Sequence, residues 1–355
     1  MTYRVAILGA GIGREHMDGY TALGERFRVT QVCDLDAARA EALAAPVGAA
    51  CASSIDAVLA NPEVDIVDIC LPPSLHVPTA ERVLASGKHV ICEKPIAGSP
   101  KDAGALADAE ATSGKRFFPV FQYRFGPAFS ALEALRTAGL LGAPRVAAAE
   151  THWNRKRDYY ANHWRGTWAH EMGGAVLSHA IHIHDLLRHE FGPVAEVSAF
   201  LDTLINPIET EDCGAILFRF ATGALATSSI TLGAADDCSR LKLVYEHLTA
   251  ESDSLPYQPG QGNWRFLART ADAQAEVDRI VADASARRAN GFAGLFEAIA
   301  DALDGADERA PTLADGIASI HLAAAIYRSQ RHGMPVALPL DASSEEYARL
   351  APEGA

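Results

Sequence analysis

The sequence lacks several features that define large classes of protein. Its 355 residues include only 31 Lys and Arg against 45 Asp and Glu, which gives a formal net charge of −14. This charge argues against nucleic acid and anionic membranes as partners. No apolar run is long enough to span a bilayer, and no signal pattern opens the sequence, so nothing predicts export. Internal repeats and low-complexity linkers are also missing.

Cysteine is scarce and unpatterned. The six cysteines have neither paired nor metal-type spacing, and several fall within predicted buried strands. Reduced core thiols in a cytoplasmic protein are the expectation. Apolar residues make up 49% of the chain and charged residues 21%, as in ordinary soluble globular proteins. A chain of this length exceeds the usual size of one core, so we expect two domains.

A glycine-rich turn is the first motif. An apolar, β-branched run covers residues 3–8, Gly9-Ala10-Gly11-Ile12-Gly13 follows, and a helix is predicted from residue 14 to 23. Such a turn brings backbone N–H groups and a helix N-terminus up to a pyrophosphate. The spacing departs from G-x-G-x-x-G, because the sixth position is Arg14. Taken alone, the motif therefore leaves a plain tight turn open.

An acidic residue follows the second predicted strand, residues 27–33. Asp34 lies about where a carboxylate holds the ribose 2′-hydroxyl of a dinucleotide. Its charge would repel a 2′-phosphate, so the sequence predicts NAD rather than NADP. The alternative makes Asp34 the N-cap of a helix near Leu35, and the two roles are compatible.

Two further loops are expected beside the glycine turn. Strands alternate with helices up to Gln122, which predicts a parallel, doubly wound sheet in a first domain of residues 1–122. Pro72-Pro73-Ser74-Leu75-His76 follows one buried strand, and Glu93-Lys94-Pro95 follows the next. A lysine at this edge is suited to hold a substrate hydroxyl and share its proton. The alternative is a surface lysine in a strand-to-helix loop.

The pattern changes after residue 122. Long alternating strands without intervening helices predict an antiparallel sheet in a second domain, residues 123–355. The strands are expected near residues 144–153, 195–203, 213–220, 224–232 and 240–248. Between the first two lies a histidine-rich stretch that reads as one helix from Ala175 onward, entered through Gly173-Gly174. On that helix His179, His182 and Asp185 would share a face, and His184 would point elsewhere.

His182 is the candidate acid/base. A histidine on an apolar helix facing a cleft can take a hydroxyl proton near neutral pH, and Asp185 is placed to orient it. The six histidines between residues 163 and 189 also raise the question of zinc. No H-x-x-x-H pair is accompanied by a placed acidic or thiol ligand, so no metal is predicted. Ordinary packing remains the alternative for each single histidine.

Taken together and in order, these motifs resemble the Gfo/Idh/MocA oxidoreductase family, named for glucose-fructose oxidoreductase, inositol dehydrogenase and a rhizopine-catabolism protein. The resemblance covers nearly the whole chain and includes His16, Pro311-Thr312, Asp315-Gly316 and residues 325–329 and 336–339. It implies an N-terminal Rossmann domain with a doubly wound parallel sheet. It also implies a C-terminal α+β domain on a large open, mostly antiparallel sheet, with the nicotinamide of NAD between the two.

The resemblance assigns roles to individual residues. Lys94 would hold the reacting hydroxyl of a sugar or polyol, and His182 would act as acid/base while a hydride passes to the nicotinamide. An aspartate commonly stands four residues before this histidine, but here the position is Ser178, and His179 is a candidate replacement. The predicted cofactor contacts are Gly9, Gly11, Ile12, Gly13, Asp34, Pro72, Ser74, His76, Glu93, Lys94, Gln122, Trp164 and Arg165. The predicted substrate contacts are Lys94, Arg124, Tyr160, Ser178, His179 and His182.

Three functions stay open at this point. The first is an NAD-dependent sugar or polyol dehydrogenase, and motifs near Trp164 are similar to sugar-oxidising branches of the family. The second is an NAD-dependent glycoside hydrolase or lyase that acts by transient oxidation and elimination. The third is a non-catalytic dinucleotide-binding regulator, which has no need of both Lys94 and His182. By resemblance, a homodimer or homotetramer is expected.

Overall fold

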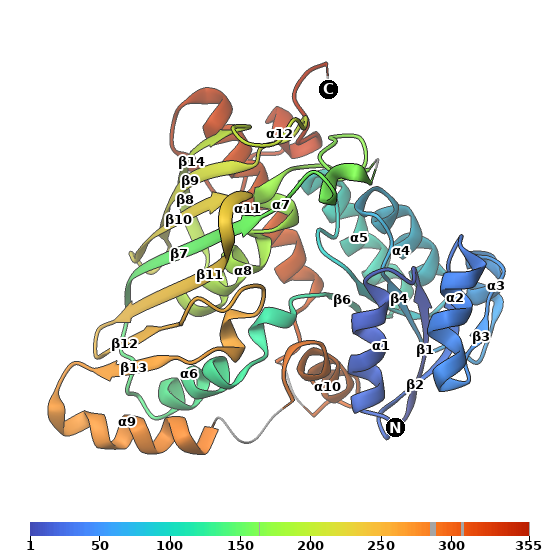
Figure 1. The fold of residues 1–355 in the computed structure, drawn as a ribbon, viewed down its shortest axis with the longest axis horizontal. Coiled ribbons are helices and arrows are strands. Elements are labelled where there is room, and N and C mark those ends of the chain that lie inside the picture. Colours follow the sequence, from blue (N-terminus) through green and yellow to red (C-terminus); the bar gives the residue numbers. More distant parts are fainter. Residues whose placement is uncertain (163, 285–288, 307–308, 355) are drawn as a thin grey trace. The chain divides into compact units, whose positions relative to one another are not determined.

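The structure is a computed structural model that describes residues 1–162, 164–284, 289–306 and 309–354 (Figure 1). It divides into two compact units. The first comprises Met1–Gln122 and Phe292–Ile317, and the second comprises Tyr123–Gly291 and Ala318–Ala355. The sequence analysis assigned residues 292–317 to the second domain, whereas the structure places them with the first. Among the described residues, no helix is long and apolar enough to cross a membrane.

The first unit is built on a six-stranded sheet in the order β3-β2-β1-β4-β5-β6. All neighbouring strands pair in parallel, so their carboxyl ends lie at one edge. The prediction of a doubly wound parallel sheet is therefore confirmed. The strands are β1 (Tyr3–Leu8), β2 (Phe27–Cys33), β3 (Ala50–Cys51), β4 (Ile66–Ile69), β5 (His89–Cys92) and β6 (Phe117–Pro119).

Helices follow the strands of this sheet as expected for crossover connections. They are α1 (Gly13–Ala22), α2 (Ala37–Ala44), α3 (Ile55–Ala60), α4 (His76–Ala85) and α5 (Pro100–Ser113), with 3₁₀ turns η1 (Ala45–Val47) and η2 (Pro73–Leu75). Helix α10 (Gly291–Leu303) follows α9 (Ala271–Ala284) in the chain and is not a crossover connection. Asp36 caps α2 by accepting the amides of Ala38 and Arg39. The alternative that made Asp34 this N-cap is therefore wrong.

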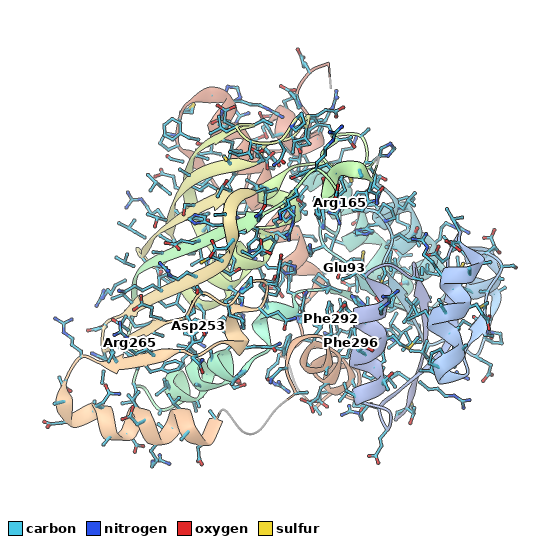
Figure 2. All side chains as sticks on the ribbon, viewed as in Figure 1. Glu93, Arg165, Asp253, Arg265, Phe292 and Phe296 are labelled. Carbon is cyan, nitrogen blue, oxygen red and sulfur yellow. The ribbon has the colours of Figure 1, made fainter. Side chains whose placement is uncertain are left out.

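Helix α10 belongs with the first unit because its aromatic rings pack against α1. The ring of Phe292 lies 4.5 Å from that of His16, and Phe296 stacks on Tyr20 at 4.0 Å (Figure 2). Burying such rings contributes strongly to a core. The contact joins residues almost 280 positions apart, which no local pattern signals.

The second unit contains an eight-stranded sheet in the order β13-β12-β11-β7-β10-β9-β8-β14. Its pairs are antiparallel except for β7 and β10, which run in parallel, so the sheet is mixed. This agrees with a mostly antiparallel sheet. The strands are β7 (Pro144–Asn154), β8 (Val194–Asp202), β9 (Cys213–Phe220), β10 (Leu225–Thr231), β11 (Gly233–Tyr245), β12 (Leu248–Glu251), β13 (Arg265–Ala268) and β14 (Val336–Ala337).

Helix α8 packs against β7 on one face of this sheet (Figure 1). The remaining helices are α6 (Pro127–Thr137), α7 (Ala175–Ser178), α8 (Ile181–Phe191), α9 (Ala271–Ala284), α11 (Leu313–His332) and α12 (Glu345–Ala348), with 3₁₀ turns η3 (Gln122–Arg124), η4 (Tyr159–Ala161) and η5 (Pro259–Gln261). The prediction of one helix from Ala175 onward is wrong. The backbone leaves the helical range at His179, where φ is −121° and ψ is −60°, and α8 begins two residues later.

Candidate active site

The glycine turn has the geometry of a phosphate-binding loop. Gly9 has a φ of 100°, and a Cβ there would lie 2.4 Å from the carbonyl oxygen of Cys70, so glycine is required. A Cβ at Gly11 would meet nothing within 4 Å, which leaves open space beside that backbone. Exposed Ile12 is the N-cap of α1, which begins at Gly13. Backbone amides at such a helix start attract a pyrophosphate.

Asp34 stands at the carboxyl end of β2, next to this turn. Its Oδ2 accepts the Ala10 amide at 2.7 Å, and its Oδ1 accepts the Asp36 amide at 2.8 Å and the Arg39 guanidinium at 3.1 Å. Burial opposes the charge, but these donors lower the pKa of Asp34 below its ordinary value. Each carboxylate oxygen accepts about two hydrogen bonds, so Oδ2 retains capacity for a ribose hydroxyl. The turn and Asp34 therefore fit NAD.

His76 ties two loops of this edge together. Its Nδ1 lies 2.7 Å from the carbonyl oxygen of Pro95, and its Nε2 lies 2.7 Å from that of Leu71. Burial lowers the pKa of His76, and the two carbonyls oppose that shift. The imidazole predicted to contact the cofactor is thus engaged by protein backbone on both nitrogens. The other predicted contacts of this loop, Pro72 and Ser74, are half-buried around η2.

Lys94 follows the end of β5 and is half-buried between buried Glu93 and Pro95. Its backbone N–H donates to Glu93 Oε2 at 3.1 Å. Gln122 ends the first segment of the first unit, and its buried Oε1 has no hydrogen-bond partner among the residues that the structure describes. A buried acceptor without a donor is costly, and a bound ligand with an N–H group would satisfy it. Gln122 therefore suits the cofactor contact predicted for it.

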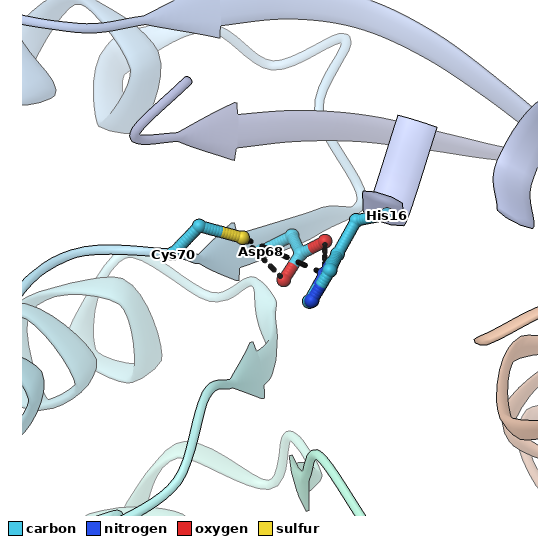
Figure 3. Close-up of side chains that lie close together, drawn as sticks. All are labelled: His16, Asp68 and Cys70. Atoms are coloured by element: carbon cyan, nitrogen blue, oxygen red, sulfur yellow. Dashed lines mark hydrogen bonds and ion pairs between the residues drawn. The ribbon is translucent and has the colours of Figure 1, made fainter. Parts of the chain in front are cut away.

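His16, Asp68 and Cys70 are close enough to share a metal ion (Figure 3). His16 Nδ1 lies 2.7 Å from Asp68 Oδ2, and the Cys70 thiol lies 3.6 Å from Asp68 Oδ1. Burial raises the pKa of Cys70 to about 12, so its sulfur is a thiol that donates to Asp68. We interpret this buried group as a hydrogen-bonded network. Asp68, the acid in an otherwise apolar strand, was the signal that the sequence analysis missed.

In the second unit, His182 is buried at the start of α8. Its ring stacks on Tyr123 with centroids 4.2 Å apart and an interplanar angle of 19°. Three residues further along, Asp185 binds the Arg124 guanidinium through two hydrogen bonds of 2.7 and 2.5 Å. The predicted substrate contact Arg124 is thus committed to an ion pair inside the unit. The predicted orienting residue Asp185 is its partner.

His179 and Ser178 act as a pair and not as alternatives. Ser178 Oγ lies 2.8 Å from the Gly174 carbonyl oxygen and 2.6 Å from His179 Nδ1. The hydroxyl has one proton, which it donates to the carbonyl, so it accepts from Nδ1–H. His179 Nε2 then carries no proton, and it accepts a hydrogen bond from the Tyr159 hydroxyl, 3.1 Å away. These hydrogen bonds fix buried His179 in the tautomer that has its proton on Nδ1. His184 points to the sheet, where its Nε2 lies 3.1 Å from Ser228 Oγ, so it differs in direction from His182 as the sequence predicts.

Glu211 was not found from the sequence, yet it holds the start of α7. Its carboxylate accepts the amides of Gly174 and Val176 at 3.1 and 2.9 Å and the Tyr327 hydroxyl at 2.9 Å. Burial raises its pKa to about 7. A Cβ at Gly174 would lie 2.0 Å from the Glu211 carbonyl oxygen, which explains this glycine. Glu211 is one of three acids in residues 209–212, so no local pattern singles it out.

Arg165 lies between two aromatic faces. Its guanidinium carbon is 4.0 Å from the ring of Trp164 and 4.4 Å from that of Tyr159, and it pairs with Glu171 at 2.8 Å. Burial raises the pKa of neighbouring Tyr160, whose hydroxyl has no hydrogen-bond partner within the described ranges. An aromatic wall with an unsatisfied hydroxyl suits a sugar. The cofactor contacts predicted for Trp164 and Arg165 stay predictions.

Comparison with known proteins identifies the family of this chain. Residues 3–121 match the oxidoreductase family with an NAD-binding Rossmann fold, and residues 129–251 match the GFO/IDH/MocA C-terminal domain. The chain belongs to the Gfo/Idh/MocA oxidoreductase family. The predicted family and fold class are confirmed, and NAD is the cofactor of the matching N-terminal family.

Individual relatives agree with this assignment. Inositol 2-dehydrogenase 3 of Saccharopolyspora erythraea is 36% identical over 152 residues, 41% of this chain and 44% of that protein. The inositol 2-dehydrogenase of Rhizobium meliloti is 27% identical over 348 residues, 93% of this chain and 97% of that protein. Several other curated relatives are matched over less than two thirds of their own length. The WlbA dehydrogenase of Bordetella pertussis, solved with NADH and UDP-GlcNAcA, is 28% identical with a TM-score of 0.85, covering 96% of this chain and 99% of that one.

Proposed function

We propose that the chain is an NAD-dependent dehydrogenase that oxidises a secondary hydroxyl of a sugar, sugar derivative or polyol. The observation that carries the proposal is Lys94 at the carboxyl edge of a family Rossmann sheet, the same edge that carries the Gly9 turn and ionised Asp34. Relatives named as inositol dehydrogenases, and one solved with a nucleotide sugar, support this substrate class.

Each unit contributes one reactive group in this proposal. Bound NAD would supply the acceptor for the hydride that leaves the substrate carbon. Lys94 donates a hydrogen bond to the reacting hydroxyl and stabilises the oxygen as its proton departs. His182, with its ring plane fixed by Tyr123, takes the proton from the same hydroxyl. The neighbouring substrate hydroxyls are then held by a hydrogen-bonded row of side chains, Ser178, His179 and Tyr159.

A substrate screen tests this function. Sugars, inositols, nucleotide sugars and glycosides are incubated with NAD or NADP, and both NADH absorbance and released aglycone are followed. The dehydrogenase accumulates NADH and leaves glycosidic bonds intact. Aglycone release without net NADH would identify the hydrolase or lyase. NADH binding without any turnover across the panel would identify the regulator.

We further propose that the chain assembles as a homodimer or homotetramer through the outer face of the eight-stranded sheet. Register places Phe200, Leu217, Leu225 and Val146 on the same face. Phe200 is 78% exposed and Leu217 57% exposed. Apolar faces of this kind mark association sites. Light scattering after size exclusion should report a dimer or tetramer for the native chain and a smaller species for Phe200→Glu; a native monomer would contradict the proposal.

We also propose a cytoplasmic location. All six cysteines are thiols, and Cys33, Cys70 and Cys92 are buried. Unpaired core cysteines are typical of proteins from reducing compartments. Fractionation of the source cells should recover the chain with cytosolic markers, and recovery with exported proteins would contradict the proposal.

A further inference from the structure

A buried chain of polar groups runs behind the loop that carries Lys94. The Tyr20 hydroxyl donates to Asp68 Oδ2 at 2.8 Å, and the same oxygen lies 2.7 Å from His16 Nδ1. On the other side of the imidazole, His16 Nε2 lies 3.1 Å from Glu93 Oε1. Glu93 Oε2 in turn accepts the Lys94 amide at 3.1 Å. The chain thus connects α1 and β4 to the residue after β5.

This network is sealed from water. His16 and Asp68 have no exposed surface, and Glu93 is 7% exposed. The centroids of the Phe292 and Phe296 rings lie 4.5 and 5.5 Å from that of the imidazole and cover it. Ionisable groups are costly in a core unless they are paired. The proposed chemistry uses none of these three groups directly, so their burial requires another explanation.

Charge and hydrogen-bond geometry define the state of His16. Its two ring nitrogens face a carboxylate oxygen each, from Asp68 and Glu93. Ionised carboxylates only accept, so both nitrogens donate and the ring is an imidazolium. The other polar groups around it are the Cys70 thiol and the Tyr20 hydroxyl. Burial lowers the pKa of His16, but the Asp68 carboxylate beside it outweighs this and raises that pKa well above its ordinary value.

We propose that His16 is a positioning residue for Lys94. The imidazolium holds one oxygen of Glu93, which leaves the other oxygen directed at the Lys94 amide and fixes the start of the loop. It also offsets the Glu93 charge beside the lysine. This inference rests on the proposed function of Lys94. The competing explanation is that His16 only stabilises the core between α1 and the sheet.

Two amide substitutions separate these explanations. In His16→Gln the amide nitrogen takes the place of Nε2 and keeps the donor to Glu93. In His16→Asn it takes the place of Nδ1 and keeps the donor to Asp68. Each variant loses one charged hydrogen bond, so both should lower the melting temperature similarly. Positioning through Glu93 predicts that kcat falls about tenfold or more in His16→Asn and stays within about threefold in His16→Gln.

The measurements are kcat and KM on the best substrate, the Kd of NADH by fluorescence, and thermal unfolding. NADH affinity should stay within about threefold of the native value in both variants, because the turn at Gly9 and Asp34 is untouched. Equal loss of kcat in both, or no loss in either, would overturn the inference. If neither variant folds, Glu93→Gln removes the charge that His16 engages and should lower kcat about tenfold; an unchanged kcat there also overturns it. The proposed function fails separately, if Lys94→Ala keeps full turnover.

Discussion

The buried ion pair between Arg124 and Asp185 gives a quantitative prediction. Their side chains are 6% and 1% exposed, and two hydrogen bonds join them. Removing one partner of such a pair leaves the other charge in the core, which costs about 3 to 5 kcal/mol. The second unit has about 200 residues, so each kcal/mol lowers its melting temperature by about 2 to 4 °C. Arg124→Ala should therefore lower it by about 6 to 20 °C.

Thermal unfolding followed by circular dichroism measures this loss. Asp185→Asn provides an independent variant, because it keeps the shape of the side chain and removes only the charge. The matched control is Arg279→Ala on α9, whose partner Glu276 is three residues away and half-exposed. Screening by solvent makes that pair weak, so no measurable shift is expected. A shift below about 2 °C for Arg124→Ala would refute the buried, charged pair.

Three further perturbations test other parts of the site. Gly174→Ala should lower the melting temperature strongly, because its Cβ would lie 2.0 Å from a backbone oxygen, whereas Gly104→Ala, with nothing within 4 Å, should raise stability by about 0.5 to 1 kcal/mol in the same assay. Glu211 has a folded pKa of about 7, above its ordinary 4.5, so the stability that it contributes is present at low pH and is lost as pH rises towards 7. In denaturant unfolding, the free energy of unfolding of the native chain should therefore fall between pH 4.5 and 7, and that of Glu211→Gln should lack this fall; an equal fall in both would contradict the assignment. Asp34→Ala should raise the KM for NAD about tenfold or more in steady-state assays, and a measured preference of the native enzyme for NADP would rule out its role.

Local patterns were sufficient for most of the first unit. The apolar run of β1 and the glycines after it carry their own signal, and β1 and α1 occur where the sequence predicts them. Contacts between distant segments carry no such signal. Helix α10 joins the first unit through Phe292 and Phe296, and the parallel pairing of β10 with β7 depends on residues about 80 positions apart. Neither is visible in a window of the sequence.

The candidate site residues were chosen by residue type, and their contacts could not be predicted from the sequence. Lys94, His182 and Asp34 were chosen from the ends of strands and the face of a helix. The helix break at His179 was missed because the apolar periodicity of the sequence continues through it. In the part of the chain that the structure describes, Glu211 binds the start of α7 and makes no contact of this kind with α8, and its position in the sequence gives no sign of that. Arg124 was assigned to the substrate because its guanidinium offers the hydrogen-bond donors that a sugar needs. Its pairing with Asp185 depends on a fold that brings η3 to α8.

The most direct test of the proposed mechanism is the turnover of Lys94→Ala. With the best substrate from the screen, NADH formation and the Kd of NADH are measured on the native chain and on the variant under the same conditions. The mechanism predicts that turnover falls by at least about a hundredfold while NADH affinity changes by less than about threefold. Full turnover in the variant would contradict the role of Lys94 and, with it, the mechanism proposed for this chain.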